Sequence, residues 1–288
     1  MSSGRSGRYP EAPGRLVPVA TYLDSIGAWH RDLASNDHRD LGALATRARA
    51  MPGPRDFTGA IKGDGTPRPG EATIALVAEI KRRSPSKGDL APDLDPAEVA
   101  RAYASGGASC LSVLTDAPHF GGSPEDLVLA RAEVGLPVLR KDFTVSQADV
   151  YDARIMGADA VLLIVALLDR GELAELSALV GDLAMAALVE VHDEDELEVA
   201  LGIGAGLVGV NQRDLHTFEV DRARAARVAR EVPPGVVKIA ESGVESAGDV
   251  AALARAGFDG VLVGEALLRR RDRRAAVAEL LGRTVPCG

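Results

Sequence analysis

The sequence predicts an α/β fold, a (β/α)8 TIM barrel with an N-terminal helical extension. Eight short apolar runs alternate with helical patterns along the chain, as they do in a series of strand–helix units. Most runs begin roughly 20 to 30 residues apart, about the length of one such unit. Three runs also follow a glycine suited to a helix end and then a short turn: Gly107, Gly157 and Gly257.

The apolar runs are the expected strands of the barrel. In chain order they are Ile74–Ile80, Cys110–Leu114, Pro137–Leu139, Ala160–Ile164, Ala187–Val191, Leu207–Val210, Val236–Ala240 and Gly260–Val263. Between them, Asp95-Pro96 and Ser123-Pro124 each place a capping residue before a proline at the first helical position. The alternative is a doubly wound open sheet. That fold usually carries a glycine-rich dinucleotide turn after its first strand, and none follows Ile80.

The region before the first strand is expected to hold a tail and two helices. Residues 1–18 are rich in Ser, Gly, Arg and Pro and predict a disordered tail. Helical patterns run from about Ala20 to Ala34 and from about Arg39 to Met51, whereas Gly59–Gly70 predicts a loop. One face of the first helix would carry Leu23, Ile26, Trp29 and Leu33. We expect residues 19–288 to form one domain that includes both helices.

Composition and charge exclude several classes of protein. With 46% apolar residues in 288, one large core can form, and because aromatics are only 3% it must be mainly aliphatic. The net charge of -9 argues against a nucleic-acid or anionic-membrane partner. The longest purely apolar stretch, Ala160–Leu168, is far shorter than the roughly 20 residues of a membrane helix. With only two cysteines and no visible signal segment, a cytoplasmic location is expected.

Polar groups follow most of the expected strands. Strand alternation places Glu79 and Lys81 on the same side at the end of the first strand. The ends of five later strands carry Arg140-Lys141-Asp142-Phe143, Glu190-Val191-His192, Asn211-Gln212-Arg213-Asp214, Glu241-Ser242-Gly243 and Gly264-Glu265. Because the carboxyl ends of barrel strands converge on one site, these groups predict a mixed cluster of acids, bases and an amide. Such a cluster suits proton transfer.

The last two turns predict a phosphate site. The loops after the seventh and eighth strands bind phosphate in many barrels. Ser242, Gly243 and Gly264 offer backbone N–H groups with little steric hindrance, and Glu265 follows directly. We therefore expect a phosphorylated small molecule as substrate.

Each of these features has a simpler explanation when taken alone. A charge at a strand end is usually solvated or half of a surface ion pair, and Ser84-Pro85 can be an ordinary turn. We expect His192 to be a loop or cap residue and Cys110 to be a packing residue. The Arg269–Arg274 cluster is expected on the solvated face of the final helix. The functional interpretation depends on the coincidence of suitable groups at six strand ends.

The chain resembles the indole-3-glycerol phosphate synthase family of the tryptophan pathway from about Pro54 to Leu281. The matching motifs are Glu79-x-Lys81-x-x-Ser84-Pro85-Ser86, Leu111-Ser112-Val113-Leu114-Thr115, Phe120-Gly121-Gly122-Ser123, Lys141-Asp142-Phe143, Leu188-Val189-Glu190-Val191-His192, Gly209-Val210-Asn211-x-Arg213-Asp214-Leu215, Glu241-Ser242-Gly243 and Val263-Gly264-Glu265-Ala266-Leu267. The resemblance implies a lyase that closes a ring in 1-(2-carboxyphenylamino)-1-deoxyribulose 5-phosphate with loss of carbon dioxide and water. It implies no metal or organic cofactor, and the protein partners it suggests are other enzymes of the pathway.

The resemblance also implies a role for each site residue. Lys141 would be the general acid at the ribulose C2 oxygen and Glu190 the general base. Lys81 would aid phosphate or substrate binding and the later dehydration. Three residues would position these groups: Glu79, Asn211 and Glu241. Arg213 would face the anthranilate carboxylate, and the pocket for its ring would be formed by Ser84, Pro85, Phe120 and Phe143.

Three positions depart from the family pattern. Gln212 stands where the family often has a second Asn, and His119 replaces the first aromatic of a Phe-Phe-Gly-Gly run. Asp149 stands where the family tends to carry Gln. One alternative is an aldose–ketose isomerase barrel, which would use a Cys and an Asp at strand ends, but Cys110 begins its strand. Another is a barrel that binds phosphate without catalysis, which the absence of Lys141 or Glu190 would favour.

Overall fold

The computed structural model describes residues 22–63, 74–85, 87–213 and 220–283. The predicted tail over residues 1–18 lies outside these ranges, and so do Ser86, Asp214, Leu215 and Cys287. The described helices are not candidates for crossing a membrane, since none combines the necessary length and apolar character.

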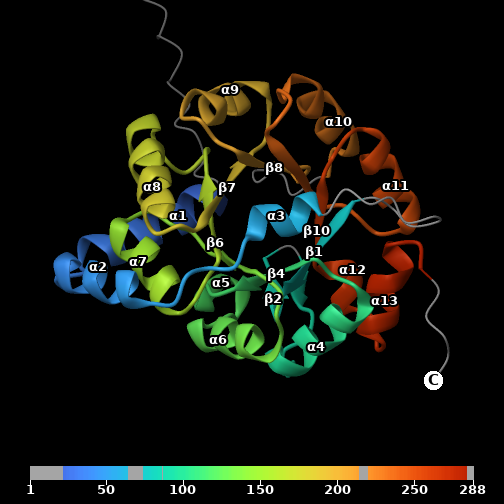
Figure 1. Cartoon of the computed structure of the whole chain (residues 1–288), viewed down its shortest axis with the longest axis horizontal. Helices are drawn as coiled ribbons and strands as arrows, with labels where there is room; N and C mark the ends of the chain where they lie inside the picture. Colours follow the sequence, from blue (N-terminus) through green and yellow to red (C-terminus); the bar gives the residue numbers. More distant parts are fainter. Residues whose placement is uncertain (1–21, 64–73, 86, 214–219, 284–288) are drawn as a thin grey trace, which may run out of the picture.

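Eight parallel strands close into a barrel, as the sequence predicts (Figure 1). They are β1 (Ala75–Ile80), β4 (Cys110–Leu114), β5 (Val138–Lys141), β6 (Ala160–Ile164), β7 (Ala186–Val191), β8 (Leu207–Asn211), β9 (Val237–Glu241) and β10 (Gly260–Val263). Each strand pairs with its neighbours in sequence, and β1 pairs with β10 to complete the ring. A two-stranded antiparallel sheet of β2 (Arg83–Ser84) and β3 (Gly88–Asp89) follows β1 and was not predicted.

Helices surround the barrel and also cover its two ends. They are α1 (Tyr22–Ser35), α2 (Leu41–Ala50), α3 (Phe57–Lys62), α4 (Pro96–Gly106), α5 (Ala117–Phe120), α6 (Pro124–Glu133), α7 (Gln147–Ile155), α8 (Arg170–Asp182), α9 (Glu194–Gly202), α10 (Arg222–Glu231), α11 (Ala247–Arg255), α12 (Glu265–Leu268) and α13 (Arg273–Leu280). The two helices predicted before the barrel are therefore confirmed as α1 and α2.

Local sequence chemistry accounts for many of the helix ends. Asp95 and Ser123 accept hydrogen bonds from the first-turn N–H groups of α4 and α6, with proline next in each case. The helix-end glycines Gly107, Gly157 and Gly257 all adopt positive φ angles, which glycine reaches without the steric cost of a Cβ atom. The turn from each of these helices into the next strand is thus encoded locally.

The predicted loop over Gly59–Gly70 is wrong for its first residues, which belong to α3. Asp56 caps this helix by accepting from the Gly59 N–H at 2.7 Å. Phe57 and Ile61 are buried against the interior of the barrel at the amino end of its strands. Figure 1 shows α3 lying across the opening of the barrel. Burial of two large side chains overrides the Gly and Pro content because it removes apolar area from water.

The predicted apolar face of α1 is half wrong. Leu23 and Ile26 are buried, but Trp29 and Leu33 are 39% and 49% exposed. The first two point towards the mouth of the barrel, where they line a cavity. The spacing of apolar residues along α1 did not indicate that the barrel covers only the first turns of this helix.

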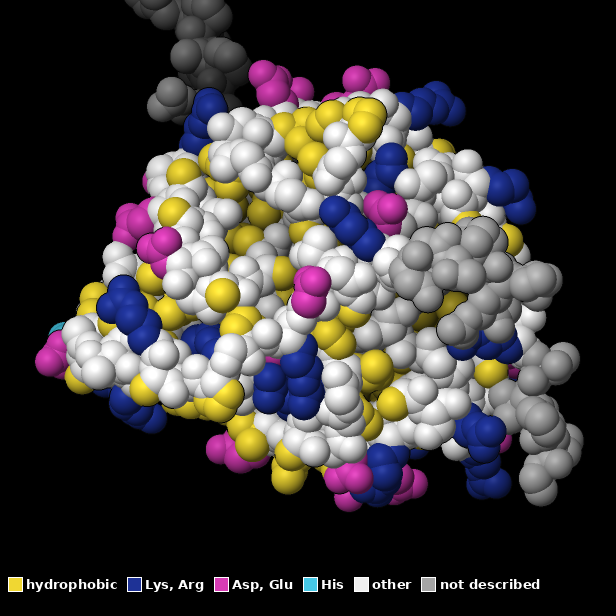
Figure 2. Space-filling model, in the orientation of Figure 1, with side chains coloured by type: hydrophobic (Ala, Val, Ile, Leu, Met, Phe, Trp, Pro, Cys, Tyr) yellow, Lys and Arg dark blue, Asp and Glu magenta, His cyan; other side chains and the backbone are white. Residues whose placement is uncertain are grey.

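The core has two layers, one inside the barrel and one between the barrel and its helices. The inner layer alternates along each strand with the outer one, so Val77 points inwards while Leu76 and Ala78 point outwards. Cys110 is buried in the inner layer, which confirms it as a packing residue. On the face seen in Figure 2, acidic and basic side chains are interspersed rather than separated by sign.

Candidate active site

One cavity of about 640 Å³ opens at the carboxyl end of the barrel. All the site residues predicted from the sequence line it: Glu79, Lys81, Ser84, Pro85, Phe120, Lys141, Phe143, Glu190, Asn211, Arg213, Glu241, Ser242, Gly243, Gly264 and Glu265. The structure therefore brings them together as expected, whereas their individual roles stay predictions.

Lys141, the last residue of β5, lies at the centre of the buried charges. Its Nζ is 3.0 Å from Glu190 Oε2 and 3.3 Å from Glu241 Oε2. Asn211 donates from Nδ2 to Glu190 Oε1 at 3.2 Å. These residues are the last or, for Glu190, the last but one of β5, β7, β8 and β9, so four strands hold one ammonium, two carboxylates and an amide in fixed positions.

The charges in this cluster shift one another's pKa values. Burial by itself would lower the pKa of Lys141, but Glu190, Glu241 and Glu79 outweigh burial and raise it above its usual range. Burial would likewise raise the pKa of Glu190, but Lys141 opposes burial and holds it well below the usual range. For Glu241, burial raises the pKa, and the neighbouring Glu190 carboxylate adds to this effect. The site therefore holds an ammonium beside one ionised carboxylate and one that retains its proton.

Glu79 and Lys81 form a second ion pair at the end of β1. The carboxylate is buried, and Gly264 leaves room for it, because a Cβ atom there would collide with it. Gly209 does the same for Glu241. Gly264 was predicted as a phosphate contact, and the structure adds this packing reason for a glycine.

The turn after β9 has an unusual backbone. Ser242 and Gly243 both adopt positive φ angles, 66° and 71°. Gln212 donates from Nε2 to the Ser242 carbonyl at 2.8 Å, so this departure from the family pattern supports the turn from the neighbouring strand end. Both turn residues face the cavity, where an anion can approach their backbone.

An apolar wall forms the opposite side of the cavity. The rings of Phe120 and Phe143 lie with centroids 6.1 Å apart, and Pro85 lies beside them in the lining. The first turns of α1 add Tyr22, Leu23 and Ile26. These three were missed because nothing in a sequence shows where an N-terminal helix docks; the spacing of Leu23 and Ile26 was the available signal.

The prediction for Arg269–Arg274 is partly wrong. Arg269 and Arg270 are solvated as predicted, at 57% and 53% exposed, but they precede α13 and border the cavity instead of lying on the final helix. Because α12 has only four residues, the chain turns back at the mouth of the barrel before α13 begins. Arg269 pairs with Glu265 at 2.6 Å, and Arg270 with Glu279 at 2.7 Å.

His192 and Asp149 have local roles. His192 lies just before α9 and contacts Glu196 in its first turn through both the backbone N–H and Nδ1, as expected of a cap residue. Its Nε2 is also 3.6 Å from Glu190 Oε1, so it adds to the charge around that carboxylate. Asp149 forms a capping box with Ser146 at the start of α7 and is absent from the lining of the cavity.

The closed barrel and the cluster at its carboxyl end define a (β/α)8 barrel with a buried acid–base site and a small-molecule cavity. Comparison with solved structures agrees on the fold. Thiamine phosphate pyrophosphorylase from Pyrococcus furiosus aligns with a TM-score of 0.54 at 18% identity, covering 73% of this chain and 94% of that one. At such low identity the likeness concerns the fold alone.

Sequence comparison gives the family. The family model for indole-3-glycerol phosphate synthase matches residues 25–280. Indole-3-glycerol phosphate synthase of Mycolicibacterium gilvum is 49% identical over 264 residues, 91% of this chain and 94% of the relative. Indole-3-glycerol phosphate synthase 2 of Streptomyces coelicolor is 50% identical over 244 residues, 85% and 92% respectively. The chain belongs to the indole-3-glycerol phosphate synthase family.

Proposed function

We propose that this protein is an indole-3-glycerol phosphate synthase, a carboxy-lyase of tryptophan biosynthesis. It converts 1-(2-carboxyphenylamino)-1-deoxyribulose 5-phosphate into indole-3-glycerol phosphate, carbon dioxide and water. The observation that carries the proposal is Lys141, a buried ammonium 3.0 Å from Glu190 and 3.3 Å from Glu241 inside a cavity with an apolar wall. Family membership supports the choice of substrate.

The first step is formation of the carbon–carbon bond. The ring carbon that bears the carboxylate attacks the ribulose C2 carbonyl, and Lys141 protonates the oxygen as the bond forms. The raised pKa of Lys141 keeps this group protonated at neutral pH, and the alkoxide that forms is basic enough to take the proton. The bond to the carboxylate then breaks, carbon dioxide leaves, and the electron pair returns to the ring.

The second step is dehydration. The C2 hydroxyl needs a proton to leave as water, and the new ring must lose a proton to become an indole. Lys81, paired with Glu79 at the end of β1, supplies the first proton. Glu190 accepts the second, because Lys141 and Asn211 hold it ionised. An acid and a base with separated pKa values can thus act on one substrate.

Binding would divide the substrate between the two sides of the cavity. Its aromatic ring would lie against Phe120, Phe143 and Pro85, with Arg213 facing the carboxylate. The phosphate would be bound by Lys81 and by the turns at Ser242-Gly243 and Gly264-Glu265. This division leaves the C2 carbon beside Lys141, at the centre of the cluster.

A direct assay tests the proposal. The purified protein, made in a host without its own synthase, is incubated with the carboxyphenylamino-deoxyribulose phosphate, and indole fluorescence is followed. Formation of indole-3-glycerol phosphate is expected from the wild type and not from Lys141→Ala. A folded wild type that yields no product would overturn the assignment.

The sequence supports further expectations about the setting. The net charge of -9 gives no support for a nucleic-acid partner. A cytoplasmic location and an association with other tryptophan-pathway enzymes stay predictions, which fractionation and co-purification would test.

A further inference from the structure

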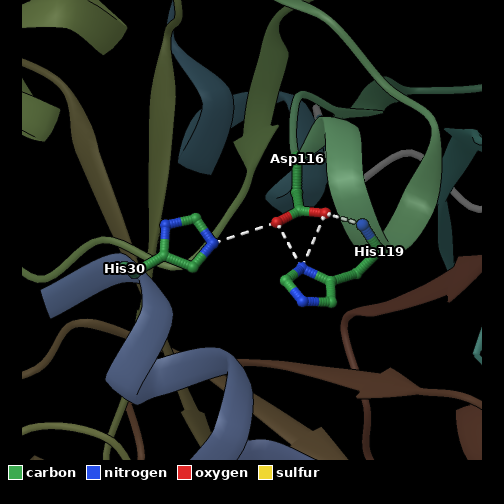
Figure 3. Close-up of side chains that lie close together, drawn as sticks. All are labelled: His30, Asp116 and His119. Atoms are coloured by element: carbon green, nitrogen blue, oxygen red, sulfur yellow. Dashed lines mark hydrogen bonds and ion pairs between the residues drawn. The ribbon is translucent and has the colours of Figure 1, made fainter. Parts of the chain in front are cut away.

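Two histidines and an aspartate converge beside the cavity and have no part in the proposed reaction (Figure 3). His30 comes from α1, whereas Asp116 and His119 come from the turn after β4 and from α5. His30 Nε2 and His119 Nδ1 each lie 2.9 Å from the same atom, Asp116 Oδ2. The cluster thus joins segments 86 residues apart.

The three donors have the composition and spacing of a transition-metal site. Two imidazole nitrogens and a carboxylate oxygen all lie within 4.8 Å of one another. Donors about 2.0–2.2 Å from a tetrahedral Zn²⁺ ion lie roughly 3.3 Å apart, so only small side-chain movements separate this arrangement from a coordinated one. Three protein ligands would leave one position for water.

Helix capping accounts for only one of the two carboxylate oxygens of Asp116. Its Oδ1 accepts from the backbone N–H groups of His119 and Phe120, at 2.7 and 3.1 Å, and so caps α5. Capping requires nothing of Oδ2, yet both rings contact that atom, and His119 Nδ1 also lies 3.2 Å from Oδ1 (Figure 3). A second carboxylate oxygen, Asp142 Oδ1, lies 3.9 Å from His30 Nε2 and adds negative charge on the same side.

The burial of the donors also suits a metal site. The Asp116 side chain is completely buried, and those of His30 and His119 are 10% and 20% exposed. Water therefore competes little for the ligands, while an ion still has a path from solvent past the imidazole rings.

We propose that His30, Asp116 and His119 bind one divalent transition-metal ion of the Zn²⁺ type, which clamps α1 onto the β4–α5 turn. The clamp would act on the cavity wall. Phe120 directly follows His119, and the ring of Phe143 lies 5.2 Å from that of His30. Since α1 also supplies Tyr22, Leu23 and Ile26 to the lining, the ion would hold the apolar side of the cavity in place.

The single tryptophan of the chain gives a direct probe of the site. The Trp29 ring lies 4.7 Å from His30 and 5.6 Å from His119, measured between centroids. In a titration of the untagged protein with Co²⁺, we expect saturable quenching of Trp29 fluorescence at one ion per chain, with visible absorption typical of tetrahedral cobalt. Added Zn²⁺ should reverse the quenching and raise the thermal unfolding midpoint.

Variants decide whether these residues are the ligands. His30→Ala and His119→Ala should each weaken Co²⁺ binding by at least about 100-fold, more than removal of an outer-shell partner usually costs. His30→Gln and His119→Gln, which retain hydrogen-bonding capacity, should weaken it similarly while unfolding near the metal-free wild-type midpoint. His38→Ala, at an exposed histidine just beyond α1, is the matched control and should bind as the wild type does.

Two results would overturn the proposal. One is a wild type whose Trp29 fluorescence and unfolding midpoint do not respond to Co²⁺ or Zn²⁺. The other is retention of metal binding in the His30 and His119 variants. That result would place the ion elsewhere, for instance at His192, which lies close to the carboxylates of Glu190 and Glu196. Neither result depends on catalytic activity, so failure here and failure of the proposed function are distinguishable.

Discussion

The two ends of the barrel bury charge in opposite ways. At the amino end, the fully buried Asp159 accepts hydrogen bonds from the backbone N–H groups of Arg55 and Val138, both at 2.8 Å. It also accepts two from the Arg131 guanidinium. At the carboxyl end, Glu241 is equally buried, but its Oε1 has no hydrogen-bond partner among the described residues. Its Oε2 shares Lys141 with Glu190.

This difference in how completely the two buried carboxyl groups are hydrogen-bonded distinguishes the end of the barrel that stabilises the fold from the end that would bind substrate. A buried carboxylate whose acceptor positions are all used contributes to folding, because its desolvation is compensated. A buried carboxyl group that shares its one cation with a second carboxylate is costly, because it must either ionise beside that carboxylate or keep a proton, and barrels accept that cost where substrate binds. Asp159 therefore belongs to the stabilising end, and Glu241 to the end where substrate would complete the interactions.

The largest expected effect is on catalysis at the carboxyl end. Lys141→Ala should lower kcat about 10³- to 10⁴-fold, or roughly 4–5.5 kcal/mol, because the proton donor for ring closure is lost. The denaturant midpoint should also fall, because removal of the ammonium leaves Glu190 buried without its cation unless it takes up a proton. Steady-state fluorescence assays and urea unfolding measure the two quantities.

Lys62→Met, at an exposed lysine of α3 on the opposite end, is the matched control and should retain wild-type kcat. If Lys141→Ala kept substantial turnover, the acid would have to be reassigned, with Lys81 as the next candidate.

The second effect is on stability at the amino end. Asp159→Ala should lower the free energy of unfolding by about 3–5 kcal/mol, because it leaves Arg131 without its buried partner and exposes unmet backbone donors. The folded fraction should retain kcat, since Asp159 lies far from the cavity lining. Urea unfolding with a parallel activity assay measures this, and Asp182→Ala, at an exposed aspartate of α8, should be nearly neutral. A loss of kcat in the folded enzyme would break the division between the ends.

The sequence predicted the strands and their polar ends because both depend on local rules. Apolar runs of strand length, capping residues and helix-end glycines mark the units, and closure of the barrel then brings the strand ends together. Lys141 and Glu190 are 49 residues apart in the chain and still could be assigned to one site. That step needed only the count of strands and their parallel direction.

What the sequence did not reveal depends on tertiary contacts. Three helix-end glycines were noticed for their turns, but after Gly157 and Gly257 it is the aspartate two residues later that carries stabilising bonds. Asp159 accepts from Val138 N, and Asp259 accepts from Lys238 N at 2.9 Å, each one strand back. Likewise α3 and the cavity-facing Arg269 depend on surfaces that no local pattern describes. The opposite pKa shifts of Glu190 and Glu241 follow from the balance between burial and neighbouring charges at each carboxyl group, and that balance exists only in the folded chain.

The third prediction concerns binding at the turn after β9. Ser242→Asp should raise KM about 10- to 100-fold, or roughly 1.4–2.7 kcal/mol, because a carboxylate would repel the phosphate in a partly desolvated site. Ser242→Asn is the matched neutral control. Asp and Asn both tolerate the positive φ angle at position 242, so the free energy of unfolding should change little in either variant. Steady-state kinetics separate KM from kcat, and an equal rise in KM for both variants would remove the phosphate from this turn.

The smallest effect tests whether the carboxyl end lowers stability. Burial raises the pKa of Glu241 to about 8, whereas in the unfolded chain it titrates near 4.3. The stabilising contribution of Glu241 to the free energy of unfolding is therefore fully present below about pH 4.3. It is lost as pH rises towards 8, at up to about 1.4 kcal/mol per pH unit. Glu241→Gln has no proton to lose at this position. From pH 6 to pH 7, its free energy of unfolding, measured with urea, should therefore rise relative to that of the wild type by up to about 1.4 kcal/mol. Glu198→Gln, at an exposed glutamate of α9, should show no such gain. Parallel pH profiles for wild type and Glu241→Gln would mean that Glu241 is as well compensated as Asp159, and the contrast between the two ends would fail.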